Sequence, residues 1–111
     1  MTATASDVVV VLTTVPVGEL GERIARTLVD EGLAACVGIH GPMTSIYRWG
    51  GRVQRDTEHQ LVIKTTADRV EALRQRLAAL HPYEVPEFLV WTVSGDGPYI
   101  DWVRAETRVE T

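Results

Sequence analysis

The chain has 111 residues, of which 45% are hydrophobic and 23% charged, so it has the length and the apolar content for one domain with a single core. Its formal net charge is -4, and no apolar run approaches the roughly 20 residues of a membrane span, which argues against binding to nucleic acid or to membranes. The single cysteine, Cys36, excludes an internal disulfide and is typical of a reducing compartment, so we expect a cytoplasmic protein.

The first part of the chain predicts a strand followed by a helix. Residues 1–6 are small and polar and are expected to be disordered, ahead of one domain over residues 7–111. The β-branched run Val8–Leu12 predicts a strand buried on both faces, which the following Thr-Thr-Val-Pro is expected to end. Apolar residues at helical spacing predict a helix over Gly18–Glu31, with Gly32 as its C-terminal cap.

The middle of the chain predicts a hairpin. One long, bent strand is expected from Leu33 to Trp49, interrupted at His40-Gly41-Pro42. Gly50-Gly51 permits a tight turn because glycine adopts positive φ freely. The return strand is expected over Glu58–Thr66, which leaves the preceding polar stretch near the hairpin tip.

The last part of the chain predicts a helix, a strand and a further helix. A three-four spacing of apolar residues predicts a helix that ends at His81-Pro82, and its apolar positions are Val70, Leu73, Leu77 and Leu80. Phe88–Val93 reads as a fourth strand. Asp96-Gly97-Pro98 is typical of the start of a short terminal helix.

This order of elements predicts an α+β, ferredoxin-like (βαββαβ) fold with an extra C-terminal helix. Right-handed crossovers place the first and third strands at the centre of an antiparallel sheet and both main helices on one face. The long second strand then becomes an apolar edge, and the other face of the sheet has no cover. We therefore expect a closed homo-oligomer.

Several motifs, in order along the chain, resemble the CutA divalent-cation tolerance family. They are Leu33-Ala-Ala-Cys-Val37, Thr44-Ser-Ile-Tyr-Arg-Trp49, Ile63-Lys-Thr-Thr66 and His81-Pro-Tyr-Glu-Val-Pro-Glu87. With further matches at Leu12–Pro16 and Tyr99–Trp102, the similarity covers roughly Asp7 to Arg104. The resemblance implies a homotrimer with PII-like architecture, cytoplasmic residence and an association with copper or other divalent ions.

One metal site described in that family uses a cysteine near the end of the first strand and two adjacent histidines before the Pro-Tyr pair. The matching positions in this chain are Thr13, Leu80 and His81, so one ligand of the three is present. A soft thiolate and a second imidazole favour copper, and both are absent at these positions.

The turn after the second helix is the best local candidate for a site. His81 either satisfies the end of the helix or acts as a ligand, and Glu84 can reach the same point if the turn folds back. Pro82 and Pro86 stiffen the turn and lower the entropy cost of presenting Tyr83 and Glu84.

Other candidate residues have two readings each. Lys64 interrupts an apolar strand, so it either extends to the surface or faces a polar pocket with Glu84 or Asp101 of a neighbouring chain. Tyr47 and Trp49 point to one face of a strand, as subunit interface or as stacking surface for a ligand. Cys36 reads as a small buried hydrophobe.

No nucleophile-base pair, phosphate-binding loop or paired metal signature is readable, so we expect a binding protein without an organic cofactor rather than an enzyme. The leading hypothesis is a trimeric module in the response to metal ions, which binds Cu²⁺ or another divalent cation at intersubunit clefts. The expected metal ligands are His81, Glu84 and Asp101, and the expected small-ligand contacts are Lys64, Tyr83 and Trp49. The alternative is a PII-like regulatory subunit that binds a small ligand or docks on a protein partner through the hairpin tip around Trp49–Arg55.

Overall fold

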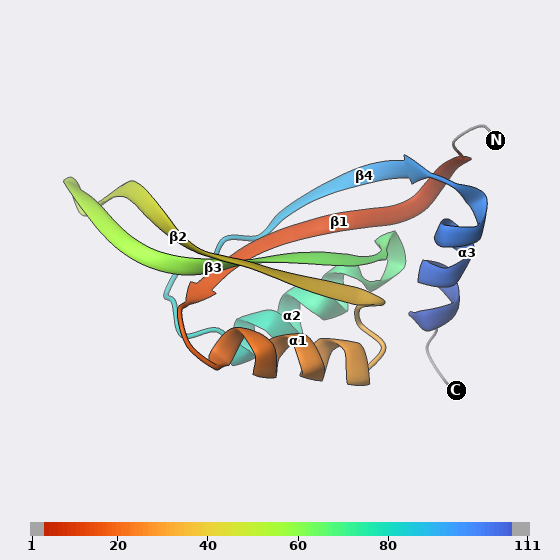
Figure 1. The fold of residues 1–111 in the computed structure, drawn as a ribbon, viewed down its shortest axis with the longest axis horizontal. Helices are drawn as coiled ribbons and strands as arrows, with labels where there is room; N and C mark the ends of the chain where they lie inside the picture. The colour runs from red at the N-terminus through yellow and green to blue at the C-terminus, as the bar shows by residue number, and fades with distance from the viewer. Residues whose placement is uncertain (1–3, 108–111) are drawn as a thin grey trace.

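The computed structural model describes residues 4–107 as one antiparallel sheet flanked by helices (Figure 1). The elements in chain order are β1 (Thr4–Pro16), α1 (Leu20–Asp30), β2 (Cys36–Trp49), β3 (Arg52–Thr66), the short 3-10 turn η1 (Ala67–Arg69), α2 (Val70–Leu80), β4 (Leu89–Gly95) and α3 (Gly97–Glu106).

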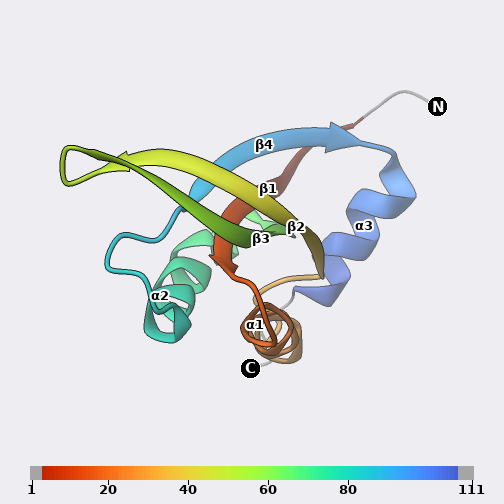
Figure 2. The same ribbon diagram turned by 60° about the vertical axis from the view of Figure 1, so that its left-hand side comes forward.

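The sheet order is β2-β3-β1-β4, so β1 and β3 are central and β2 and β4 are the edges. Both α1 and α2 lie on the same face of the sheet, whereas α3 lies across one end of it (Figure 2). This arrangement confirms the predicted ferredoxin-like fold, including the assignment of central and edge strands.

The core fills the space between the sheet and the two main helices. Alternate residues of the central strands point to this face because successive strand residues face opposite sides, and they include Val9, Val11, Val15, Leu61 and Ile63. They pack against Ile24 and Leu28 of α1 and Leu73 and Leu77 of α2, which are four residues apart in each helix. Each such buried side chain stabilises the fold by about 1.5–3 kcal/mol.

The opposite face of the sheet is apolar and largely uncovered within the described part of the chain. Leu12 of β1 pairs with Val62 of β3 and with Leu89 of β4, and Val10 pairs with Trp91, so these side chains share a face. Leu89 and Trp91 are 53% and 48% exposed. Such a contiguous apolar surface is typical of a protein interface.

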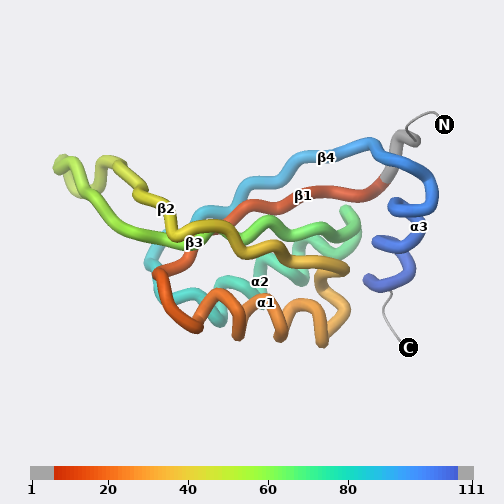
Figure 3. The backbone as a smooth tube through the Cα atoms, viewed as in Figure 1, coloured from red at the N-terminus to blue at the C-terminus, as the bar shows by residue number. Residues whose placement is uncertain are grey.

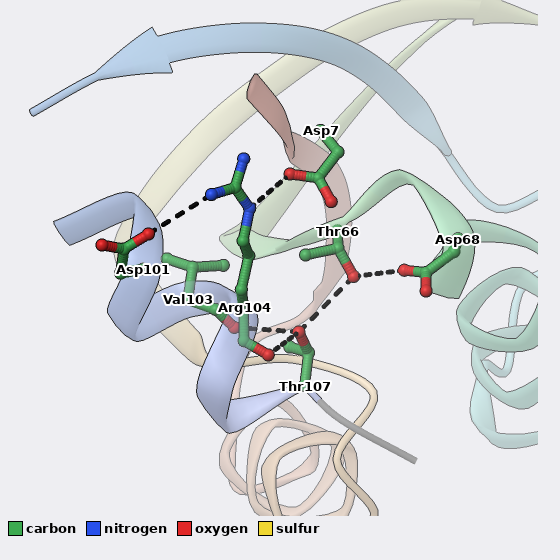
Figure 4. Close-up of polar contacts among 7 residues, drawn as sticks. All are labelled: Asp7, Thr66, Asp68, Asp101, Val103, Arg104 and Thr107. Carbon is green, nitrogen blue, oxygen red and sulfur yellow. Dashed lines mark hydrogen bonds and ion pairs between the residues drawn. The ribbon is translucent and has the colours of Figure 1, made fainter. Parts of the chain in front are cut away.

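Helix α3 covers only the end of that face. Ile100 and Val103 pack with Val8 and Ala35 in a second small apolar cluster. The helix is also tied to the start of the sheet by Arg104, whose Nε donates a hydrogen bond of 2.7 Å to Asp7 (Figure 4). The predicted terminal helix is confirmed, and it packs against the N-terminal part of β1.

Two strands are longer than the sequence indicated. The prediction that β1 ends after Leu12 was wrong, because Thr13 to Pro16 continue to pair with β3 and Pro16 is the last residue, where a missing N–H costs nothing. Of the segment expected to be disordered, residues 1–3 lie outside the described residues, and Thr4 to Ser6 belong to β1. Strand β3 begins at Arg52 rather than Glu58, because the polar stretch pairs with the outer half of β2.

Two features of the hairpin confirm predictions. The register of β2 against β3 shifts between His40 and Met43, which bends the strand as expected. Gly50 and Gly51 have φ of 59° and 77°, so both central residues of the turn are left-handed, as a type I′ hairpin requires. Gly41, at the bend, has φ of 112° and lies against the backbone of β3.

The bend is expected to tolerate substitution far less well than the turn. A Cβ added at Gly41 would lie 2.9 Å from the amide nitrogen of Met43 and 3.0 Å from the carbonyl oxygen of Glu58, whereas at Gly51 it would meet nothing within 4 Å. Both positions have positive φ, which alone costs a non-glycine residue about 1–2 kcal/mol. We expect Gly41→Ala to lower the free energy of unfolding in urea clearly more than Gly51→Ala does, at equal protein concentration. Equal losses would contradict a collision at the bend.

Candidate functional site

A cavity lies where β1 ends and the hairpin continues. Strand β1 ends at Pro16, opposite Glu58, and beyond this point β3 pairs only with β2. The segment 81–88 connects α2 to β4 (Figure 3). It runs beside the part of β3 that no longer pairs with β1. A cavity of about 630 Å³ opens between this segment and the hairpin.

The cavity is acidic and aromatic. Its carboxylates come from β3 and from the 81–88 segment, and they are Asp56, Glu58, Glu84 and Glu87. Its aromatic walls are Tyr47, Trp49 and Tyr83. Asp56 and Glu58 are two residues apart on a strand and therefore share the face that lines the cavity. Among the described residues that line it, none is lysine, arginine or histidine.

The side chain of His81 does not line the cavity; it contacts the end of β1 instead. Helix α2 ends there because His81 has extended backbone, as expected of a residue before proline. The side chain is 8% exposed; Nε2 donates to the carbonyl oxygen of Thr14 at 2.7 Å, and Nδ1 accepts from the amide of Tyr83 at 3.1 Å. This pair of partners requires the neutral tautomer protonated at Nε2. His81 therefore fixes the turn with both of its nitrogens.

Two tyrosines hold carboxylates of the cavity in place. Tyr83 Oη donates to Glu58 Oε2 at 2.7 Å, and Tyr47 Oη donates to Asp56. Burial and the hydrogen bond to Glu58 raise the pKa of Tyr83, and the hydrogen bond to Asp56 raises the pKa of Tyr47. Both phenols therefore stay protonated at neutral pH and act as hydrogen-bond donors.

Glu87 is the carboxylate of the cavity that has a buried oxygen atom, Oε2, without a hydrogen-bond donor in residues 4–107. Burial raises the pKa of Glu87, and the negative charge of Glu58 raises it further. Ionisation of Glu87 is therefore costly at this position, and a bound positive charge would lower that cost.

The six residues predicted for the site do not come together within one chain. Trp49, Tyr83 and Glu84 line the cavity. Lys64 lies toward α3, where its Nζ donates to Tyr99 Oη at 3.2 Å. Asp101 lies on α3 itself and accepts a hydrogen bond of 3.3 Å from Arg104 (Figure 4).

The described part of one chain contains no group of three His, Cys, Asp or Glu residues placed to hold a metal ion. Sequence reasoning missed three carboxylates of the cavity, Asp56, Glu58 and Glu87. The alternation of Asp56 and Glu58 was the signal that could have placed those two on one face. Nothing in the sequence connects Glu87 with them.

None of the helices in residues 4–107 is both long and apolar enough to cross a membrane.

The stability of the protein is expected to depend on the charge of Glu87. A carboxyl group whose pKa is higher in the folded chain than in the unfolded chain stabilises the fold below its ordinary pKa of about 4.3, and this contribution is lost as pH rises through the folded pKa. Glu87→Gln removes the charge, so we expect the variant to have a larger free energy of unfolding than the unchanged protein at pH 7 and a similar one at low pH.

Urea unfolding at several pH values measures this difference. Glu22→Gln, which removes an exposed carboxylate on α1, is the matched control for the loss of one charge. A gain at pH 7 for both variants, or for neither, would argue against a cost of ionised Glu87.

Comparison with known proteins connects this architecture to one family. The family model for the CutA1 divalent ion tolerance protein matches residues 9–106. The divalent-cation tolerance protein CutA of Thermus thermophilus is 48% identical over 99 residues, which is 88% of this chain and 96% of that protein. The chloroplastic protein CutA 1 of Oryza sativa is 40% identical over 96% of this chain, which spans only 61% of that protein.

Solved structures agree with the sequence comparison. The crystal structure of CutA from Xylella fastidiosa has a TM-score of 0.88 at 43% identity and covers 93% of this chain and 100% of its own. The PII-like protein CutA from Nostoc, in apo form, has a TM-score of 0.85 at 44% identity and covers 92% of this chain and 99% of its own. The chain therefore belongs to the CutA1 divalent ion tolerance family, as its motifs predicted.

Proposed function

We propose that the protein acts in the cytoplasm as a homotrimeric module that binds copper or another divalent cation at the seams between subunits, in the response to metal ions. The observation that carries this proposal is the acidic cavity beside the hairpin, in a chain whose family is named for divalent-cation tolerance. No reaction and no organic cofactor are part of the proposal, and the family is named as a tolerance protein rather than as an enzyme.

The exposed surfaces of the sheet support the trimer. Each subunit has two free edges, β2 and β4, and an apolar face that includes the half-exposed Leu89 and Trp91. Pairing the β2 edge of one subunit with the β4 edge of the next is a head-to-tail contact that can close into a ring. Three is the number of subunits that the resemblance to the CutA family implies.

The proposed metal site draws on more than one subunit. Glu84 lies exposed at the cavity and can bind a cation without rearrangement, and Asp101 of a neighbouring subunit is the proposed second carboxylate. His81 can coordinate a metal only if it gives up one of its two hydrogen bonds. Carboxylates alone favour hard cations, whereas an imidazole favours copper, so the role of His81 decides the metal preference.

The proposed small-ligand contacts divide in the same way as the metal ligands. Trp49 and Tyr83 line the cavity, where an aromatic face can stack on a ligand. Lys64 lies near α3, away from the cavity of its own chain. It can therefore contribute only to the cavity of a neighbouring subunit. The trimer and the composite site are therefore parts of one proposal.

Titration with copper and with zinc tests the metal site. We expect Glu84→Gln and Asp101→Asn each to weaken binding by at least about tenfold, because each removes a charged ligand. Glu22→Gln is the matched control and should bind as the unchanged protein does. Unchanged affinity of both Glu84→Gln and Asp101→Asn would reject these ligands, and unchanged copper affinity of His81→Ala would eliminate His81.

The solution mass of the same samples provides the control for assembly. Each variant must have the mass of three subunits for its affinity to be comparable with that of the unchanged protein. A fully folded, soluble single subunit would contradict the trimer and, with it, the composite site.

A PII-like regulatory role is the second candidate, and the hairpin tip favours it. Trp49 and Val53 are 50% and 66% exposed there, beside Arg52 and Arg55. Exposed aromatic and arginine side chains are enriched in protein interfaces.

If the tip binds a regulatory partner, changing Arg52 and Arg55 together to alanine should remove one specific protein from those recovered in a pull-down. The matched control changes Arg23 and Arg26 of α1 to alanine and should leave that protein bound. Recovery of the same proteins by both double variants would exclude docking through the tip.

A further inference from the structure

Both nitrogens of the His81 imidazole are engaged by groups of the same chain. Nε2 donates to the carbonyl oxygen of Thr14 at 2.7 Å, and Nδ1 accepts from the amide of Tyr83 at 3.1 Å. The side chain is 8% exposed in a single chain, so assembly with other subunits can only bury it further. Because both partners are backbone groups of its own chain, these contacts do not depend on how subunits are arranged.

One of the two contacts is compatible with metal coordination and the other is not. A histidine that binds a metal commonly donates its second ring N–H to a backbone carbonyl, as Nε2 does here to Thr14. The lone pair left for a metal is then that of Nδ1, and the Tyr83 amide already occupies it. The ring of Tyr83 also lies beside the imidazole, with 4.7 Å between the two ring centroids. A metal at Nδ1 would therefore take the place of the Tyr83 amide.

The two other positions of the metal site described for the family offer no substitute ligand. Thr13 is fully buried on the core face of β1, where it alternates with Val11 and Val15, and its Oγ1 has no hydrogen-bond partner among the described residues. Leu80 packs against the same core. The copper ligand set that the family implies therefore does not fit the residues of this chain.

We infer that His81 is a positioning residue and not a metal ligand: it fixes Tyr83 to the end of β1, so that the Tyr83 phenol meets Glu58. Tyr83 Oη donates to Glu58 Oε2 at 2.7 Å, so His81 acts on this carboxylate through Tyr83. The inference also deepens the proposed metal function, and in this respect it rests on that function. A divalent cation at the seam between subunits is held without the imidazole of His81.

Two substitutions separate the roles of the two nitrogens. The side-chain oxygen of asparagine takes the position of Nδ1 and can accept from the Tyr83 amide, whereas the side-chain nitrogen of glutamine takes the position of Nε2 and can donate to Thr14. Neither side chain contains an imidazole. A positioning role at Nδ1 is therefore retained in His81→Asn and lost in His81→Ala, whereas coordination by the ring is lost in both.

Hydrogen exchange of backbone amides, followed by NMR, tests the positioning role. The exchange rate of the Tyr83 amide is compared with that of the Ile100 amide, which donates to Asp96 on the distant helix α3 and reports changes in global stability. We expect this ratio to rise by about tenfold in His81→Ala, the usual effect of losing one hydrogen bond, and to rise clearly less in His81→Asn. An unchanged ratio in His81→Ala, or equal rises in both variants, would overturn the inference.

Zinc titration of the same protein, labelled with ¹⁵N, tests whether the ring binds metal. The His81 ring signals are those that are missing in His81→Asn, and we expect them to stay unchanged when zinc saturates a site that Glu84→Gln weakens. A coordination shift at either ring nitrogen would overturn the inference and leave the metal function standing. Absence of zinc binding together with a raised Tyr83 exchange ratio in His81→Ala would reject the metal function and support the positioning role.

Discussion

The hydrogen bond from Tyr83 to Glu58 connects the segment between α2 and β4 to the point on β3 where its pairing with β1 ends. Glu58 is only 7% exposed, so without this donor a nearly buried carboxylate would lose its partner, at a cost of about 1–3 kcal/mol. His81 places Tyr83, because its Nδ1 accepts the Tyr83 amide while Nε2 binds the carbonyl of Thr14. The cavity therefore depends on a short chain of contacts from β1 through the turn to β3.

The two ends of the sheet have different chemistry. Near α3, Lys64 contacts Tyr99, and Arg104 lies between Asp7 and Asp101, so the charged groups largely pair with one another. At the hairpin end, Glu58 and Asp56 accept hydrogen bonds from tyrosines, and no basic side chain of residues 4–107 lines the cavity. A ligand that needs both ends must bridge subunits.

Local patterns were sufficient for the fold but not for the site. The run Val8–Leu12 and the helical spacing of apolar residues located the central strand and both main helices, because burial on a defined face imposes those periods. Strand length was missed, because pairing with β2 extends β3 through a polar stretch that has no strand pattern of its own. The prolines around Tyr83 indicated the turn, but recognising Asp56 requires knowing that β3 extends beyond β1. Asp101 lies on α3, and the end of the sheet at which α3 docks is set by tertiary packing that no local pattern indicates.

A cation bound beside Glu87 favours the ionised form of its carboxyl group, whichever cation binds. Burial and the charge of Glu58 raise the pKa of Glu87, and a positive ligand beside the carboxyl lowers that pKa again. A metal requires several ligands around one point, whereas the carboxylates of this cavity are distributed over two walls that face aromatic and apolar surface.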